Sequence, residues 1–383
     1  MNAGFDMTKV QRGARLRRTP YFEATQRYGP KGFTVYNHML FPTHYDDFER
    51  EYDKLRNDVT LWDVGVERNV EITGPDGFDF TNLLTPRDLS KCEIGQGKYV
   101  VITDEDGGII NDPVLLRLGE NHFWLALADS DVLLWAKGAA YKLGMDVEIR
   151  EPDVSPLQIQ GPKSKQVIEK LFGSKVSELK YYYFLETELS GIPVVVTRTG
   201  WSAELGYEVY LRDGSRGVEL YERIMEAGKP YNIAPTGPSD IRRIEAGILN
   251  YGIDMTLDHN PYEVGLGWIV DLDQEADFIG KEALKHIKAE GVQRKLVGVE
   301  IGGDALPFNM TSWPVSQKET GVGHITSAIY SPRLKKNIGY AWVPIDQAAL
   351  GTELNITVLQ ADDRLATVVR KPFVDPKKDI PKS

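Results

Sequence analysis

The 383-residue chain has almost no cysteine, since Cys92 is the only one. A disulfide within the chain is therefore excluded, and a reducing, cytoplasmic compartment is expected. No apolar run approaches the roughly 20 residues that a membrane-spanning helix needs. Basic charge is also scarce, because 45 Lys and Arg stand against 56 Asp and Glu, a net charge of −11. This balance argues against a nucleic acid or an anionic membrane as partner.

Sequence patterns of the commoner kinds of catalysis are also missing. The six histidines have none of the spacings typical of zinc or iron sites, so no metal is expected. There is no Walker-type phosphate loop, and Gly265–Trp268 is too short to form a dinucleotide-binding loop. Two segments, Asn111–Pro113 and Gly200–Tyr210, each set one acidic side chain among aromatic and glycine neighbours, like two halves of a pocket for a flat, polar heterocycle. They suggest the transfer of a group onto a bound organic carrier, steered by carboxylates.

Hydrophobic periodicity divides the chain into two or three domains, as its length requires. One segment, 66–150, has the order β-α-β-β-β-α-β, which is close to a ferredoxin-like unit with an extra strand. From residue 295 onward only strand-like segments appear, which indicates a small barrel or sandwich. Helices are predicted at 48–59, 218–228 and 238–249, and further strands at 192–198 and 206–210.

The first 20 residues carry five basic side chains and no secretory apolar segment. Asp6 fits a transit peptide poorly, so we expect a solvated basic tail and not a targeting sequence. The basic residues of this segment are Lys9, Arg12, Arg15, Arg17 and Arg18.

Asp112 lies in Asn111-Asp112-Pro113, where a turn enters the apolar strand that begins at Val114. A carboxylate at such a point can be partly buried, and burial raises its pKa toward a value useful in catalysis. The alternative is an ordinary turn with local Asx hydrogen bonds. The residues alone leave both interpretations open.

Glu208 lies in the alternating segment Gly206–Tyr210, in which Glu208 and Tyr210 share one face. If that face is interior, the carboxylate can accept two parallel N–H bonds from a ring amidine such as that of a pterin. If it faces solvent, Glu208 is an ordinary surface acid.

Aromatic residues are frequent around these positions. Such rings can stack on a heterocycle or surround a cation, and packing in a core is the alternative for most of them. The four consecutive rings of residues 181–184 cannot all point to the same side of a strand or a helix. The rings in question are Tyr36, Tyr99, Tyr181, Tyr182, Tyr183, Phe184, Trp201 and Tyr210.

Taken together, these motifs resemble the tetrahydrofolate-dependent aminomethyltransferase family, that of the glycine-cleavage T-protein, from about residue 30 to residue 373. The resemblance implies an α+β fold, a three-domain cloverleaf with folate in its central opening. Its domains would be a folate-binding domain (1–65 and 157–285), a ferredoxin-like domain (66–156) and a C-terminal β-barrel (286–383). The motifs that carry it are Gly107–Asp112, Gln160–Lys163, Arg198–Trp201, Gly206–Tyr210, Arg243–Gly247 and Gly265–Trp268.

By motif position, the resemblance also implies roles for single residues. Glu208 would bind the pterin ring, and Asp112 would lie beside the folate nitrogens near the reacting group as the catalytic residue. The remaining predicted site residues are Tyr99 and Tyr182 for folate, and Tyr36, Trp201 and Tyr210 for the substrate.

Within the family, several segments resemble the branch that demethylates dimethylsulfoniopropionate. The T-protein usually has Asp-Asp at Asn111-Asp112 and Tyr at Trp201, and its Gly-Ala-Arg-Asp motif is replaced here by Gly237–Asp240. The segments are Thr34–Leu40, Trp62–Val64, Val66–Arg68, Asn111–Pro113, Ala128–Val132 and Glu151–Pro156.

The implied reaction moves a methyl group from this sulfonium to N5 of tetrahydrofolate, giving methylthiopropionate and 5-methyl-tetrahydrofolate. The partner is then a small-molecule methyl donor, and a homodimer is left open. The alternatives are a demethylase of another O- or N-methyl donor, a glycine cleavage aminomethyltransferase, and a folate-binding protein without turnover.

Overall fold

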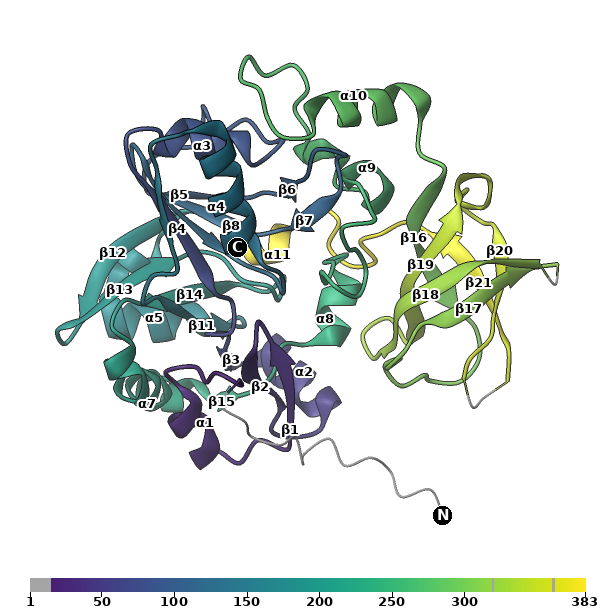
Figure 1. Ribbon diagram of the computed structural model, residues 1–383. Coiled ribbons are helices and arrows are strands. Elements are labelled where there is room, and N and C mark those ends of the chain that lie inside the picture. The colour runs from purple at the N-terminus through teal and green to yellow at the C-terminus, as the bar shows by residue number, and fades with distance from the viewer. Residues whose placement is uncertain (1–14, 319, 360–361) are drawn as a thin grey trace.

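The computed structural model describes residues 15–318, 320–359 and 362–383. It contains two large open sheets, two two-stranded sheets and a closed barrel. Figure 1 shows the barrel on one side, the large sheets on the other, and helices α8 and α9 between them. The predicted α+β fold class with a C-terminal barrel is confirmed.

The six-stranded sheet has the order β12-β13-β14-β11-β3-β15, and every neighbouring pair is antiparallel except β15 with β3. Helices α1, α5 and α7 pack on it through apolar side chains such as Ala24, Ile168 and Ile224. The strands are β3 (Val59–Asp63), β11 (Ser155–Gln160), β12 (Phe184–Leu189), β13 (Ile192–Thr197), β14 (Gly206–Leu211) and β15 (Ile233–Pro235). The helices are α1 (Phe22–Arg27), α5 (Ser164–Phe172), α6 (Ser174–Ser177) and α7 (Gly217–Gly228), with 3₁₀ turns η2 (Gly214–Arg216) and η3 (Lys229–Tyr231).

The five-stranded antiparallel sheet has the order β10-β4-β9-β8-β5. Strands β4, β8, β9 and β10 with helices α3 and α4 give β-α-β-β-α-β, and β5 is the extra strand at the edge, as the sequence predicted. The elements are β4 (Asn69–Thr73), α3 (Gly77–Leu83), β5 (Gln96–Tyr99), β8 (Val114–Gly119), β9 (His122–Ala126), α4 (Val132–Leu143) and β10 (Glu148–Arg150), and the ribbon β6 (Ile102–Thr103) and β7 (Ile109–Asn111) leaves it.

The two sheets meet through a small apolar cluster that includes Leu116, Trp124, Val195 and Tyr210. The Trp124 and Tyr210 ring centroids are 6.3 Å apart. A hairpin of β1 (Gly32–Tyr36) and β2 (Met39–His44) precedes α2 (Phe48–Asn57), whose first turn is capped by the Asp47 carboxylate. These contacts fix the inner faces of the sheets relative to each other.

The barrel closes in the order β16-β19-β18-β17-β20-β21. From residue 295 onward the sequence predicted strand-like segments in a small barrel or sandwich, and the structure has a closed barrel. The bounds are β16 (Arg294–Ile301), β17 (Trp313–Gln317), β18 (Thr320–Ser331), β19 (Lys336–Pro344), η5 (Ile345–Gln347), β20 (Glu353–Ile356) and β21 (Arg364–Val369). Between the sheets and the barrel lie α8 (Asp240–Glu245), α9 (Pro261–Val264), η4 (Gly267–Ile269) and α10 (Lys281–Glu290), and α11 (Asp379–Lys382) follows the barrel.

Two predictions need correction. The helix expected at 238–249 has only the six residues of α8, because Gly247 turns to φ +72° and packs against Pro372. The basic tail is not wholly solvated either, since Arg17 pairs with Glu151 at 2.6 Å and its main chain bonds to the β1–β2 hairpin. Lys9 and Arg12 lie outside the described residues.

Candidate functional site

Asp112 directly follows β7 and is held by a tyrosine across the sheet. The Tyr99 hydroxyl donates to its Oδ2 at 2.8 Å. Burial raises the pKa of Asp112 to about 7, and the negative charge of Asp254 adds to the rise. The carboxylate is therefore buried and bonded by a residue outside its own turn, with a pKa near neutral pH.

The neighbouring Asn111 anchors the backbone beside Asp112 to the segment that contains Ala128 and Ser130. Its amide nitrogen donates to the Ala128 carbonyl at 3.0 Å and to Ser130 Oγ at 2.8 Å, while its oxygen accepts from the Ala128 N–H at 3.0 Å. An aspartate at this position has no N–H to donate. Asn111 therefore acts as a positioning residue for Asp112.

The tip of the β1–β2 hairpin brings Tyr36 to the same region. Its turn residues Asn37 and His38 have φ of 47° and 64°, as in a type I′ turn. The Asn37 amide donates to the Val66 carbonyl at 3.0 Å and so docks the tip on the ferredoxin-like unit. Burial raises the pKa of Tyr36 well above its usual value, and nearby carboxylates that include Asp112 raise it further.

Glu208 lies on the central strand β14 and is only 3% exposed, so the interior interpretation is correct. Its Oε2 accepts from Thr199 at 2.6 Å and from Tyr210 at 2.9 Å, and its Oε1 accepts from Gln158 at 2.7 Å. Burial raises the pKa of Glu208 while these hydrogen bonds lower it. Since a carboxylate oxygen has two lone pairs, Oε1 retains capacity for one further N–H.

A third carboxylate, Glu67, belongs to this region, and sequence reasoning missed its role. Burial raises the pKa of Glu67 well above its usual value, and the negative charges of Glu208 and Asp112 add to the rise. None of the ion pairs formed by the described residues includes any of these three acids. Glu67 lies within a quoted family-like motif, but its nearness to Glu208 depends on how the two sheets pack.

A cavity of about 260 Å³ is lined by Tyr99, the residue that donates to Asp112, whereas neither Asp112 nor Glu208 is among its lining residues. Tyr99 and Tyr182 line it, as predicted for folate-binding residues, and so does Trp268, which is 61% exposed and lies 6.5 Å from the Tyr99 ring. The Tyr182 carbonyl accepts from the Gly97 N–H at 2.7 Å, which fixes the backbone there. The volume suits one flat ring system better than a whole drug-sized ligand, whose pocket is typically ~300–1,000 Å³. The lining residues are Arg87, Gln96, Gly97, Lys98, Tyr99, Tyr181, Tyr182, Trp268 and Lys378.

The three aromatic residues predicted to bind the substrate differ in how deeply they are buried. Trp201 is partly buried in a cluster with Trp62 and Val64, and the Arg243 guanidinium lies 5.8 Å from its ring centroid. Tyr210 is fully buried, with its hydroxyl on Glu208, so its ring is part of the packing between the sheets. Trp201 and Tyr36 keep partial exposure and can present ring surface to a ligand.

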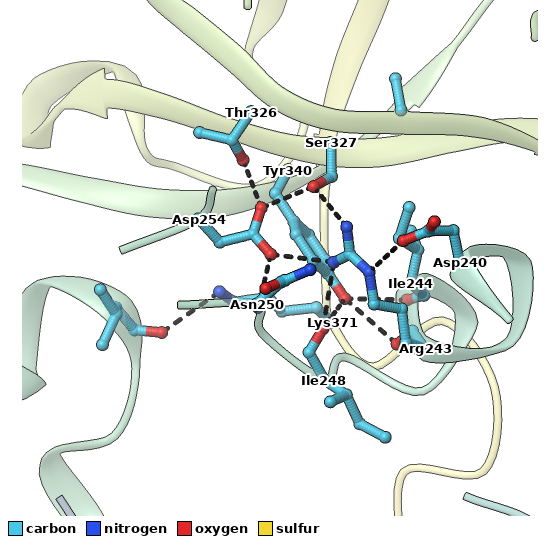
Figure 2. A network of polar contacts seen from close by, with 12 residues as sticks. Asp240, Arg243, Ile244, Ile248, Asn250, Asp254, Thr326, Ser327, Tyr340 and Lys371 are labelled. Atoms are coloured by element: carbon cyan, nitrogen blue, oxygen red, sulfur yellow. Dashed lines mark hydrogen bonds and ion pairs between the residues drawn. The ribbon is translucent and has the colours of Figure 1, made fainter. Parts of the chain in front are cut away.

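Figure 2 shows the polar network that joins α8 to the barrel. Arg243, fully buried, donates to Asp240 at 2.6 Å, to Asp254 at 2.9 Å and to Ser327 Oγ at 2.9 Å. Asp254 in turn accepts from Thr326 at 2.7 Å and from Ser327 at 2.6 Å, both on β18. The network sets the position of Arg243 beneath Trp201 and holds the barrel against the site.

Replacing Glu208 with glutamine is expected to weaken tetrahydrofolate binding by about 1.5–3 kcal/mol, because a charge-assisted bond becomes a neutral one. Titration by quenching of protein fluorescence measures this. Glu188→Gln, on the exposed side of β12, is the matched control, and thermal unfolding checks that both variants fold. Unchanged affinity in a folded Glu208→Gln variant would mean that the carboxylate does not contact the ring.

Among the residues that the structure describes, no group of three or more His, Cys, Asp or Glu side chains is arranged to hold a metal ion. The described helices include none with the length and apolar character needed to cross a membrane.

Comparison with known proteins covers nearly the whole chain. Residues 6–274 match the GCVT N-terminal domain, and residues 294–375 match the glycine cleavage T-protein C-terminal barrel domain. The dimethylsulfoniopropionate demethylase of Ruegeria pomeroyi is 38% identical over 367 residues, 96% of this chain and 100% of its own. An aminomethyltransferase of Bacillus cytotoxicus is 32% identical over 363 residues, 94% of this chain and 98% of its own. The crystal structure of aminomethyltransferase T from Bartonella henselae has the same fold, with a TM-score of 0.84 at 23% identity, over 94% of this chain and 98% of that one.

Proposed function

The chain belongs to the glycine cleavage T-protein family of tetrahydrofolate-dependent one-carbon transferases, and we propose that it demethylates a small methylated substrate, with dimethylsulfoniopropionate, whose sulfonium carries the methyl group, as the leading candidate. The 38% identical relative that carries this activity in its name supports the proposal. So does the replacement of the T-protein arginine by Ser239, whose hydroxyl instead caps α8 by accepting from the Arg242 N–H at 3.3 Å.

The observation that carries the proposal is the acidity of the site. Asp112, Glu67 and Glu208 converge there, and none of them pairs with an Arg or Lys of the described residues. The positive charge of a sulfonium beside these groups would favour their ionised forms, whereas a neutral aryl ether would not. Ring surface on Tyr36 and Trp201 adds attraction for a sulfonium through cation–π contact.

The residues present fit a folate. Tyr99, Tyr182 and Trp268 offer ring faces for a flat heterocycle, and Glu208 Oε1 offers an acceptor for a ring N–H. When bound, tetrahydrofolate supplies N5 as the methyl acceptor.

In the proposed step the C–S bond breaks as a C–N bond forms, and the sulfur leaves with the electron pair as a neutral thioether. The protein therefore needs no strong acid. In this proposal Asp112, oriented by Tyr99, would stabilise the positive charge that develops on nitrogen and would accept the proton released there. Holding donor and acceptor in line contributes roughly 7–11 kcal/mol when the orientation is good.

The direct test incubates the protein with tetrahydrofolate and a panel of donors, and follows 5-methyl-tetrahydrofolate and the demethylated product together. The panel holds dimethylsulfoniopropionate, an aryl methyl ether, an N-methyl amine and a lipoyl-bound aminomethyl group. Equal formation of methyl-folate and methylthiopropionate from the sulfonium supports the proposal. Methylene-folate from the aminomethyl donor alone would identify a glycine cleavage enzyme instead.

Trp201→Leu is expected to raise KM for the sulfonium by roughly 2- to 30-fold with little change in folate affinity, because the ring face contributes ~0.5–2 kcal/mol. Trp201→Phe, which keeps an aromatic face, is the matched control and should lose less. Since the Arg243 guanidinium also lies over this ring, melting temperatures must be compared first. An equal loss of folate affinity and sulfonium turnover would place Trp201 against the pterin.

A further inference from the structure

Gln158 connects two residues that the proposed function assigns to different ligands. It lies on β11, is 1% exposed, and is paired in register with Glu208 on the neighbouring strand β14. Its amide nitrogen donates to Glu208 Oε1 at 2.7 Å, and its amide oxygen accepts from the Trp201 N–H at 3.2 Å. Thr199 also bonds to Glu208, but through its own hydroxyl and not through the Trp201 backbone. One buried amide therefore joins the acid proposed for the folate ring to the tryptophan proposed for the methyl donor.

The chemistry of its two neighbours fixes the orientation of this amide. An ionised carboxylate can only accept and a backbone N–H can only donate, so the Gln158 nitrogen must face Glu208 and its oxygen must face Trp201. A protonated Glu208 could instead donate to the amide oxygen, and the turned amide would then direct its own N–H groups at the Trp201 N–H. Two donors would face each other, and the bond to Trp201 would be lost. The Gln158 amide thus has two discrete arrangements, and only one of them holds Trp201.

Trp201 belongs to the loop 198–205, whose start is fixed by another part of the chain. Arg198 donates to the carbonyls of Pro381 at 3.0 Å and of Ser383 at 2.7 Å, in the segment 375–383 that follows the barrel. These bonds do not depend on Glu208, so they hold the start of the loop whether or not a ligand is bound there.

Gln160, two positions along β11, supports the same loop without contacting Glu208. It accepts from the Ser202 hydroxyl at 2.5 Å and is fully buried. In the part of the chain that the structure describes, Gln160 forms no hydrogen bond with Glu208. The link from Glu208 to the backbone of Trp201 therefore runs through Gln158, whereas Gln160 has a purely structural contact with the loop.

We propose that Gln158 is a positioning residue that couples the two ligands, so that tetrahydrofolate on Glu208 strengthens binding of the methyl donor beside Trp201. By linkage, the donor then strengthens binding of the folate by the same factor. This inference rests on the proposed function, since it takes Glu208 as the folate-binding acid and Trp201 as a contact of the donor. A ring N–H that donates to Glu208 favours the ionised carboxylate, and with it the amide arrangement that holds the Trp201 backbone. Both ligands thus bias the same two-state element.

The test measures initial rates over a grid of tetrahydrofolate and dimethylsulfoniopropionate concentrations, which gives the constant of each substrate at low and at saturating levels of the other. In the wild type each substrate should tighten the other by roughly three- to tenfold, as expected when about one hydrogen bond is gained. In Gln158→Met, which keeps the length of the side chain but has no amide, this factor should fall below about twofold. Gln158→Asn, whose amide is too short to reach both partners, should behave in the same way, and thermal unfolding checks that each variant folds.

Gln160→Met is the matched control, because it removes a contact with the same loop from the same face of β11. It should raise the constant of the sulfonium by the same factor with and without folate, and so should keep the coupling of the wild type. Loss of the coupling in this control to the same extent as in Gln158→Met would mean that any loosening of the loop is sufficient, and would overturn the assignment to Gln158.

The remaining outcomes separate this inference from the proposed function. Demethylation without coupling in the wild type, or with full coupling in both Gln158 variants, would overturn the role of Gln158 and leave the demethylase proposal standing. If the wild type forms no methyl-folate from dimethylsulfoniopropionate, the substrate assignment fails and the coupling fails with it.

Discussion

Asp112→Asn is expected to lower turnover at least tenfold while leaving tetrahydrofolate affinity within about twofold, because even ~1.4 kcal/mol of lost transition-state stabilisation is a factor of ten in rate. The substitution keeps the size of the side chain and an oxygen that can accept from Tyr99, so the geometry around it should survive. It removes the negative charge that would stabilise the methylated nitrogen. Asp106→Asn, in the exposed turn before β7, is the control. Turnover within about twofold of the wild type would restore the turn-only interpretation.

The pH dependence gives this prediction a second readout. The pKa of Asp112 is raised to about 7, so the active carboxylate is lost as the pH falls below 7, and the wild-type rate should fall with it. Asp112→Asn should abolish that limb of the profile. Tyr99→Phe should move the limb to higher pH, because the tyrosine hydrogen bond lowers the pKa of the carboxylate. A limb that persists in Asp112→Asn would belong to another acid, with Glu67 the first candidate.

Arg243→Met is expected to destabilise the fold by about 3–5 kcal/mol, because it leaves Asp254 as a buried charge without its partner. Asp254 would keep its bonds from Thr326 and Ser327, which limits the loss to that range. Thermal and urea unfolding measure the effect. Arg27→Met, which breaks a solvent-exposed pair with Glu222, should cost no more than about 1 kcal/mol.

A double variant shows whether Arg243 and Asp254 stabilise the fold as an ion pair or independently of each other. Arg243→Met with Asp254→Asn should lose clearly less stability than the sum of the two single variants, because the second change removes the orphaned charge. Additive losses would mean that Asp254 is stabilised mainly by its hydroxyl donors. Loss of folate affinity in Arg243→Met under conditions where it is folded would link this network to the site through Trp201.

Local sequence signals predicted much of the fold and part of the site. Asp47 caps α2 as its residue type suggests, and alternation placed Glu208 and Tyr210 on one face of a strand. Whether that face was buried depended on β14 lying between β11 and β13, which only the assembled sheet shows. For the same reason α8 ends early at Gly247, since the contact with Pro372 comes from far along the chain.

The residues that sequence reasoning missed share one property. Glu67 becomes part of the site through the packing of two sheets, and Arg87 and Lys378 meet only because a segment beyond the barrel returns to the first sheets. Charged side chains of these types are common on any surface, so neither spacing nor periodicity marks them. The motif resemblance singled out Asp112, Tyr99 and Tyr182 because those residues stand in recognisable local patterns, and their predicted roles stay predictions.

The attachment of the segment 375–383 to Arg198 also affects how the protein folds. Arg198 and Ser383 are 185 positions apart, so this contact closes a very long loop. Contacts of such high sequence separation slow folding, because loop entropy is lost before the contact forms. The cavity wall that contains Lys378 therefore depends on a contact whose formation carries a large entropic cost. A ligand that needs this wall binds the native state and not its partly folded precursors, and so stabilises the whole chain by a free energy that grows with the logarithm of its concentration.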